Sequence, residues 1–339
     1  MRIPYRTRRA IGRAAVVLLV ITLAVLLIWL CWMLWLGRFV VYTDNGVRFD
    51  FDRTTLEITG EPALPPVEQE TVSIFYNEGE NAVNVSRELA QIGGYYISTS
   101  DLKGDIAALK NQLQLVDKDA AVMVEVKNAF GEFNYSTAVS SNYNTSVDQA
   151  AVDGLIKQLT KGSHYTIARV TAFQDYHYGL NNVDEGLFST GGAYLWRDDL
   201  GCYWLNPSSE KVMAYLVQIA TELKNLGFNE VVFDQFLFPA SDGYRFGDDK
   251  QTALATAANT LVDACATNAF AVSFVSTPAF ALPEGRSRLY LQGIEASAVA
   301  VVADGITVPD KTIQLVFLTE VHDTRYDAYS VLRPITAMK

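Results

Sequence analysis

The stretch that decides the fold class is Leu226-Gly227-Phe228-Asn229-Glu230-Val231-Val232-Phe233-Asp234-Gln235-Phe236-Leu237-Phe238-Pro239. A helical pattern ends at Gly227, a short apolar run closes on Asp234, and an aromatic exit ends at Pro239. Glycine is a typical helix end, and a short apolar run between turn signals is typical of a buried strand. The stretch therefore predicts a helix that leads directly into a buried strand.

The same alternation continues on both sides. Strand-like runs lie at 95–97, 121–126, 165–170, 231–233, 271–275, 298–302 and 313–318, and helical patterns at 101–113, 147–159, 209–226 and 250–266 separate most of them. Such alternation is typical of a parallel sheet with crossover helices. Seven strands are evident, and an eighth is weak or absent around 331–335. We therefore predict an α/β fold, a TIM-type (β/α) barrel incomplete at the C-terminus, with an open doubly wound sheet as the alternative.

An uncharged run near the N-terminus predicts a membrane anchor. It covers 23 residues, 14–36, and five arginines precede it. About 20 apolar residues cross a bilayer, and arginine-rich flanks stay in the cytoplasm. No small-residue cleavage site follows, so the sequence predicts an uncleaved single-pass signal anchor in the cell membrane. Residues 1–13 are then cytoplasmic, and the C-terminal part is extracytoplasmic. A buried helix of a soluble domain is the alternative.

Two further segments complete the predicted organisation. Residues 37–88 show alternation around Asp44-Asn45-Gly46, which predicts a β-hairpin, and prolines at 62, 65 and 66 predict a linker. Residues 89–339 suffice for one barrel domain.

The charge balance limits the partners. The chain has 27 basic and 38 acidic residues, and six of the arginines flank the predicted anchor, which leaves a net charge of about −17 for the exterior part. Such a surface disfavours nucleic acid and anionic lipid. Outside the predicted anchor, Cys202 and Cys265 permit one disulfide but no disulfide framework.

Asp234 and Arg169 are the first candidate site residues. Asp234 ends a predicted strand, where parallel barrels place their functional side chains, although a turn-capping aspartate is the alternative. Arg169 lies inside an apolar strand, and a buried guanidinium usually needs a carboxylate nearby. We expect Asp234 to be that carboxylate, in a functional or a structural ion pair.

Four segments resemble, in the same order, a family of bacterial TIM-barrel proteins that are usually secreted or membrane-tethered. This family is related to glycoside hydrolases and was long catalogued as a domain of unknown function. The segments are Met123-Val124-Glu125-Val126-Lys127 with Gly131, Ile167-Ala168-Arg169-Val170 with Phe173 and Asp175, Trp204-Leu205-Asn206-Pro207, and Gly227 to Asp234 with Phe238-Pro239. The resemblance covers about Ile92 to Pro239. It implies hydrolysis of O-glycosyl bonds, and it implies substrate-binding roles for Lys127, Arg169, Asp175 and Asn206.

The chain also departs from the family pattern. Gln235 and Leu237 stand where the family has tyrosine and arginine. Ser273–Ser276 lacks the acidic residue expected after the fifth strand, and Val302–Gly305 replaces a Pro-Met-x-Tyr-Pro-Ser turn. These departures predict that the second half of the barrel is shortened and that the chain is a degenerate member of the family. A catalytically inactive barrel that binds glycan or serves as an envelope scaffold is therefore the alternative function.

Glycoside hydrolysis needs one protonated and one ionised carboxyl group. Asp234 is the candidate ionised group, as nucleophile or charge stabiliser. Its candidate partners near predicted strand ends are Glu125, Asp175, Asp304 and Glu320. We assign catalysis to Asp234, Glu320 and Glu125, because Glu320 has the fewest cations nearby, and substrate binding to Asp175 and Asp304. For each one, an ordinary surface carboxylate is the alternative.

Trp196 and Trp204 lie in a polar loop and are the candidates for stacking on sugar rings. No cofactor or metal is expected, because the chain lacks nucleotide-binding and nucleophile-elbow motifs and its three histidines lack zinc-site spacing. The sequence predicts a membrane-anchored, extracytoplasmic glycoside-hydrolase-like protein. Its expected partners are a cell-envelope or environmental glycan and, through the N-terminal helix, the membrane. A ligand-free structural protein of the envelope is a third hypothesis.

Overall fold

The computed structural model describes residues 89–338, the strand residues 40–43 and 46–49, and positions 22, 26 and 29. The chain divides into two units, residues 1–80 and 81–339, and each is described by itself. In the first unit, β1 (Val40–Thr43) pairs antiparallel with β2 (Gly46–Phe49). This pairing confirms the predicted β-hairpin.

Most of the predicted anchor, residues 14–36, and all of the proline-rich linker lie outside the described residues. Thr22, Leu26 and Trp29 are helical. Among the residues that are described, none belongs to a helix long and apolar enough to cross a membrane.

Eight parallel strands close into a barrel in the second unit. In chain order they are β3 (Gly93–Ile97), β4 (Ala121–Lys127), β5 (Tyr165–Thr171), β7 (Glu230–Asp234), β9 (Ala271–Val275), β10 (Leu289–Gln292), β11 (Leu315–Leu318) and β12 (Ser330–Pro334). Each strand pairs with the next one, and β12 pairs with β3, which closes the ring. The TIM-type barrel is confirmed, and the expectation of an incomplete barrel is wrong.

Two short strands explain why the sequence patterns did not predict a complete barrel. β10 has four residues and directly follows Arg288, and β12 contains Arg333 and ends on Pro334, so neither is a plain apolar run. The run 298–302, expected as a strand, instead begins helix α8 (Val299–Gly305). Its residues Val299 and Ala303 are buried whereas Val301 is exposed, as on one face of a helix. An apolar run of five residues fits both the periodicity of a strand and that of a helix.

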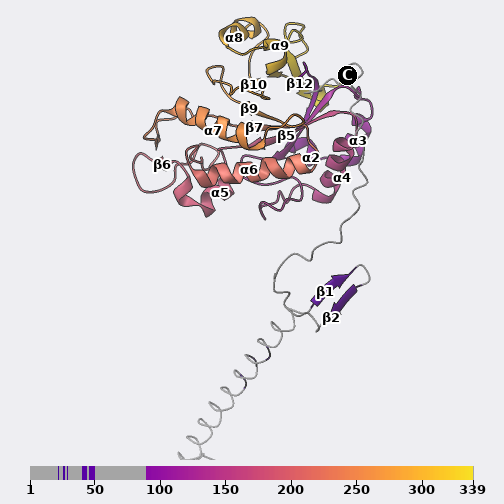
Figure 1. Ribbon diagram of the computed structural model, residues 1–339, viewed down its shortest axis with the longest axis vertical. Helices are drawn as coiled ribbons and strands as arrows, with labels where there is room; N and C mark the ends of the chain where they lie inside the picture. Colours follow the sequence, from indigo (N-terminus) through magenta and orange to yellow (C-terminus); the bar gives the residue numbers. More distant parts are fainter. Residues whose placement is uncertain are drawn as a thin grey trace, which may run out of the picture. The chain divides into compact units, whose positions relative to one another are not determined.

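Helices cover the outer face of the barrel mainly in its first half (Figure 1). They are α2 (Thr99–Leu102), α3 (Ile106–Leu113), α4 (Gln149–Thr160), α5 (Tyr176–Asn181), α6 (Glu210–Asn225), α7 (Lys250–Cys265) and α9 (Lys311–Gln314), in addition to α8. The segments 276–288 and 319–329, which lead into β10 and β12, contain no helix. The second half is therefore shortened, as the sequence predicted.

The remaining elements are small. β6 (Phe188–Ser189) pairs antiparallel with β8 (Tyr244–Arg245), and two 3₁₀ turns, η2 and η3, span Val183–Glu185 and Ile335–Ala337. Helix α6 shows why the predicted helix–strand unit forms. The Ser209 hydroxyl accepts a hydrogen bond from the Val212 amide at its start, and Gly227 takes a φ of +95° just after its end.

Side chains alternate between two cores. Outward-facing residues such as Val124 and Phe233 pack against the helices, and inward-facing residues such as Met123, Ile167 and Val232 fill the barrel. This alternation places polar side chains at both ends of the barrel interior, with an apolar layer between them.

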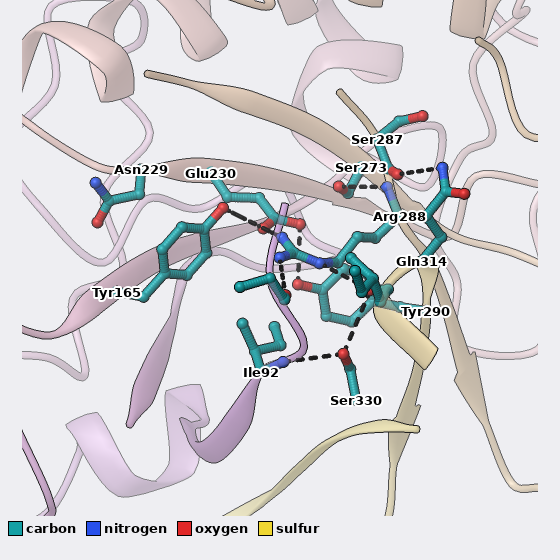
Figure 2. A network of polar contacts seen from close by, with 12 residues as sticks. Ile92, Tyr165, Asn229, Glu230, Ser273, Ser287, Arg288, Tyr290, Gln314 and Ser330 are labelled. Atoms are coloured by element: carbon teal, nitrogen blue, oxygen red, sulfur yellow. Dashed lines mark hydrogen bonds and ion pairs between the residues drawn. The ribbon is translucent and has the colours of Figure 1, made fainter. Parts of the chain in front are cut away.

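At the N-terminal end, the interior holds a buried polar network centred on Arg288 (Figure 2). The guanidinium forms an ion pair with Glu230, and both side chains are fully buried. Arg288 also donates to the main-chain carbonyls of Ala90 and Ile313, at 2.8 and 3.1 Å. Tyr165 and Tyr290 each donate to Glu230 at 2.9 Å. Because every charge has partners and no exposure, this network joins strands and is not a ligand site.

Candidate active site at the barrel mouth

The carboxyl ends of three neighbouring strands bring three charged side chains together. Glu125 on β4 pairs in register with Arg169 on β5, which pairs with Val232, two residues before Asp234 on β7. All three side chains follow the inward alternation described above. The C-terminal mouth of the barrel therefore carries two carboxylates, one on each side of the strand that holds the guanidinium.

Arg169 and Asp234 form the predicted ion pair. Nε and Nη2 of Arg169 donate to Oδ2 of Asp234 at 3.0 and 2.7 Å. Oδ1 of Asp234 accepts from the main-chain amide of Gln235 at 2.7 Å. Gln235 adopts a φ of +51°, a left-handed conformation that costs energy for a residue with a Cβ atom. Three donors therefore complement the negative charge of Asp234.

Glu125 contributes to the same cluster. Its Oε2 accepts from the main-chain amide of Thr99, the first residue of α2, at 2.7 Å. Burial alone would lower the pKa of Arg169, but the charges of Asp234 and Glu125 outweigh burial and raise this pKa. The guanidinium therefore balances two carboxylates.

A pocket of about 570 Å³ opens beside this cluster, at the exits of β3, β10 and β11. Its lining includes Tyr96, Gln292, Glu295, Glu320 and Tyr326. Burial raises the pKa of the Tyr96 phenol, and the charge of Glu320 raises it further, while Arg169 acts in the opposite direction. Tyr96 is thus within electrostatic range of both charges and links the pocket to the Arg169–Asp234 pair.

Lys127 and Asp175 lie elsewhere. A register shift in the pairing of β4 with β5 falls between Glu125 and Lys127, and the ammonium of Lys127 lies 5.8 Å from the ring of Tyr215 on α6, outside the barrel. There it forms a 2.8 Å ion pair with Asp175, and both side chains are almost fully buried. The ammonium of Lys127 also donates to the carbonyl of Thr171 at 2.7 Å, at the end of β5. The pair therefore holds the loops against the strand end, and its charged groups are buried in the protein.

In the loop between β5 and α6, the side chains that were predicted to bind substrate make contacts within the protein. Trp204 is buried, and its Nε1 donates to Asp198 at 2.8 Å. Trp196 is half-buried and packs on Tyr244. Asn206 accepts from the amide of Ser208 at 2.9 Å, which shapes the turn before α6. The structure therefore shows no free tryptophan face at Trp204.

Asp304 lies in α8 and not at a strand end. Its side chain is 83% exposed and is 3.7 Å from Lys311. The expectation that Asp304 follows a strand is wrong because the run 298–302 is helical.

Two side chains at the mouth, Tyr96 and Gln292, are not among the site residues assigned from the sequence, although Tyr96 is one of the strand-end aromatic residues suited to stacking on a sugar ring. Tyr96 alternates with Tyr95, and only the register of β3 shows which of the two faces inward. Gln292 ends β10, a strand that was not recognised. Along residues 89–338, Cys202 and Cys265 are free and buried, and no cluster of three or more His, Cys, Asp or Glu side chains could hold a metal ion.

Residues 94–281, more than half of the chain, match the model of a protein family described as "Putative glycosyl hydrolase domain". The chain belongs to this family. Its glycoside-hydrolase-like character is thereby shown, in agreement with the resemblance of the four sequence segments. The match begins in β3 and ends beyond β9, so it includes Glu125, Arg169 and Asp234 but not Glu320.

Solved structures with similar folds include a hypothetical protein from Ruminiclostridium thermocellum. That protein is 20% identical, with a TM-score of 0.46 over 52% of this chain and 96% of its own. The glycoside hydrolase domain of PelA from Pseudomonas aeruginosa is 13% identical, with a TM-score of 0.40 over 74% of this chain and 96% of its own. The α-galactosidase TtGalA from Thermus thermophilus is 13% identical, with a TM-score of 0.42 over 60% of this chain and 42% of its own. No curated protein matches the sequence significantly.

Proposed function

We propose that this protein is a membrane-anchored, extracytoplasmic glycoside hydrolase that acts on a cell-envelope or environmental glycan. The observation that supports this proposal most strongly is the charged cluster of Asp234, Arg169 and Glu125 beside an open pocket that carries Glu320. Strand ends at the mouth of a TIM-type barrel are the usual place for catalytic side chains. Membership in the family described as "Putative glycosyl hydrolase domain" supports this reaction class.

Each carboxylate has a distinct proposed role. Asp234 receives three hydrogen bonds that favour negative charge, which suits the ionised nucleophile or charge stabiliser. Glu320 lines the open pocket and makes no hydrogen bond or ion pair within residues 89–338, so its carboxyl group can reach a bound glycan, and we assign it the role of acid at the leaving oxygen. Glu125, held by the Thr99 amide, supplies a second negative charge that acts on the guanidinium of Arg169.

One observation favours a second function. Both oxygens of Asp234 are engaged within the protein, and the residue is only 7% exposed. A carboxylate held in this way also suits a structural ion pair. A barrel that binds glycan without turnover is therefore the alternative.

The test is release of reducing ends from a panel of envelope and plant glycans by the full-length chain in mild detergent. Glycan binding is recorded in the same samples. Asp234→Asn keeps the shape of the side chain, and Asp248→Asn makes the same change at an exposed position that lines a different pocket, beside α6 and α7. The proposal predicts turnover by the wild type and by Asp248→Asn, and loss of turnover in Asp234→Asn. Binding without turnover in all three proteins would establish the alternative.

The proposed location rests on the uncharged run 14–36 and the arginines before it. A C-terminal epitope on the full chain should fractionate with membranes, and protease added to intact cells should remove it. Protection of the epitope in intact cells would contradict the proposed orientation.

A further inference from the structure

A neutral polar pocket of about 470 Å³ opens between the loop 139–142, which follows β4, and the helices α5 and α6. Small-molecule sites usually measure about 300 to 1,000 Å³. Among the described residues that line this pocket, Lys211 is the only charged one, and its ammonium pairs with Glu185 at 2.6 Å. The pocket shares no lining residue with the pocket beside Tyr96. It is therefore a separate, uncharged recess on a chain whose net charge is −11.

Three side-chain amides line this pocket. Asn142 comes from the loop, Asn181 ends α5, and Gln218 lies on α6. Within residues 89–338, none of these three side chains forms a hydrogen bond. An amide carries both donors and an acceptor, so it matches hydroxyl groups, which also donate and accept. The free amides therefore suit an uncharged ligand that is rich in hydroxyl groups.

Tyr178 gives the pocket an aromatic wall. Its ring stacks on Tyr215 of α6, with centroids 4.3 Å apart and an interplanar angle of 25°, and its hydroxyl donates to the carbonyl of Lys211 at 3.2 Å. One carboxylate holds both tyrosines, because Asp175 accepts from the amide of Tyr178 at 2.7 Å and from the hydroxyl of Tyr215 at 3.2 Å. The buried pair of Lys127 and Asp175, which has no part in the proposed chemistry, thus supports the aromatic wall of this pocket.

The wall formed by the loop is also fixed. Glu222 on α6 accepts from the amide of Ala138 at 2.8 Å and from the hydroxyl of Tyr135 at 2.7 Å. The hydroxyl of Thr137 donates to the same carboxylate. These three hydrogen bonds hold the segment that leads into 139–142 against α6. A site with walls fixed before binding loses less conformational entropy when a ligand enters.

We propose that this pocket is a second glycan-binding site, which takes neutral sugars such as hexoses or N-acetylhexosamines. The amides of Asn142 and Gln218 bind hydroxyl groups, and the ring of Tyr178 packs on the apolar C–H face of a sugar. A sugar acid finds no unpaired cation in this lining. The inference goes beyond the proposed hydrolysis, because this site holds a glycan away from Asp234 whether or not the mouth cleaves it.

The experiment follows hydrogen exchange of the full-length Asp234→Asn chain in mild detergent, so that turnover does not consume the probe. The probes are hexasaccharides of β-linked glucose, of N-acetylglucosamine and of galacturonate. We expect at least one neutral hexasaccharide to protect residues 139–142 and 176–182, which border the pocket, and the galacturonate hexasaccharide to protect neither segment. The affinity is read from the protection of residues 176–182 as the probe is added.

Variants then test the assignment. Asn142→Ala combined with Gln218→Ala should weaken the neutral probe by about tenfold. Asn268→Ala combined with Gln251→Ala is the matched control, because it changes two exposed amides outside the pocket, and it should leave the affinity unchanged. Tyr178→Phe keeps the ring and should retain the affinity, whereas Tyr178→Leu should lower it severalfold.

The outcomes separate this inference from the proposed function. Absence of protection by both neutral probes at millimolar concentration, or equal losses in the double variant and its control, would overturn the inference. In the chain that retains Asp234, the double variant Asn142→Ala with Gln218→Ala should keep the wild-type kcat on a short substrate. Protection at the pocket without turnover on any glycan would overturn the hydrolase and leave the second site standing.

Discussion

Arg169 gives both of its hydrogen bonds to one oxygen of Asp234, Oδ2, and leaves Oδ1 to the amide of the next residue in the chain. The pair joins neighbouring strands at the mouth of the barrel, and the two side chains are 16% and 10% exposed. The ion pair is therefore partly desolvated, and it fixes the direction of the carboxylate on which the proposed chemistry depends.

Removal of the guanidinium should destabilise the protein. Arg169→Met leaves the carboxylate of Asp234 poorly solvated and without its cation, which should lower the free energy of unfolding by about 3 kcal/mol. Urea unfolding measures the change. Arg286→Met is the matched control, because Nε of Arg286 is buried without a hydrogen-bond partner and its loss should cost less than about 1 kcal/mol. Equal losses in the two variants would contradict the importance of the pair.

Loss of one partner of the ion pair at the opposite end of the barrel, between Glu230 and Arg288, should cost more stability. Glu230→Gln leaves Arg288 charged and fully buried, and the expected loss in the free energy of unfolding is about 4 kcal/mol. Replacing both residues with methionine should recover part of this loss, because no unpaired charge remains. Arg325→Gln in an exposed ion pair should leave the urea midpoint unchanged. A single variant of Glu230 with an unchanged midpoint would contradict the structural role of the network.

Alkaline pH should unfold the protein through its buried tyrosines. Burial raises the pKa of Tyr165 and of Tyr290, and the charge of Glu230 raises both further. In the unfolded chain these phenols ionise near their ordinary pKa of 10.0. Their contribution to stability is therefore complete below about pH 10 and is lost as the pH rises above that value. Phenolate absorbance and circular dichroism should change together, and ionisation of all tyrosines in a protein with intact secondary structure would contradict this expectation.

Replacement of Gln235 by glycine should stabilise the folded protein. Its φ of +51° costs a residue with a Cβ atom about 1 kcal/mol, and glycine avoids this cost. After the larger entropy loss of glycine on folding, Gln235→Gly should stabilise the protein by roughly 0.5 kcal/mol. Gln235→Ala keeps the strain and should show no gain. The midpoints of thermal unfolding compare the two, and a lower midpoint for the glycine variant would show that the Gln235 side chain stabilises the mouth.

Much of the fold and part of the site followed from sequence patterns. The helix before β7 and the position of Asp234 were predictable because a glycine stop and a short apolar run are strong local signals. The pairing of Arg169 with Asp234 was predictable because a guanidinium inside an apolar strand needs a carboxylate.

Other features depend on geometry that local patterns do not contain. A register shift after Glu125 turns Lys127 away from the mouth and buries it against Asp175. The approach of Tyr96 to Glu320 depends on closure of the barrel between strands that are far apart in the chain. Neither effect has a sequence signal that periodicity detects.

The most direct test of the central claim is the turnover of one cleaved glycan by four proteins, the wild type, Asp234→Asn, Glu320→Gln and the double variant. Groups that act as a unit are strongly non-additive. The account predicts that each single change lowers kcat by about 100-fold or more and that the double variant is little worse than the more damaging single change. A single variant that retains wild-type kcat, or no measurable turnover by the wild type on any glycan, would contradict a catalytic pair of Asp234 and Glu320.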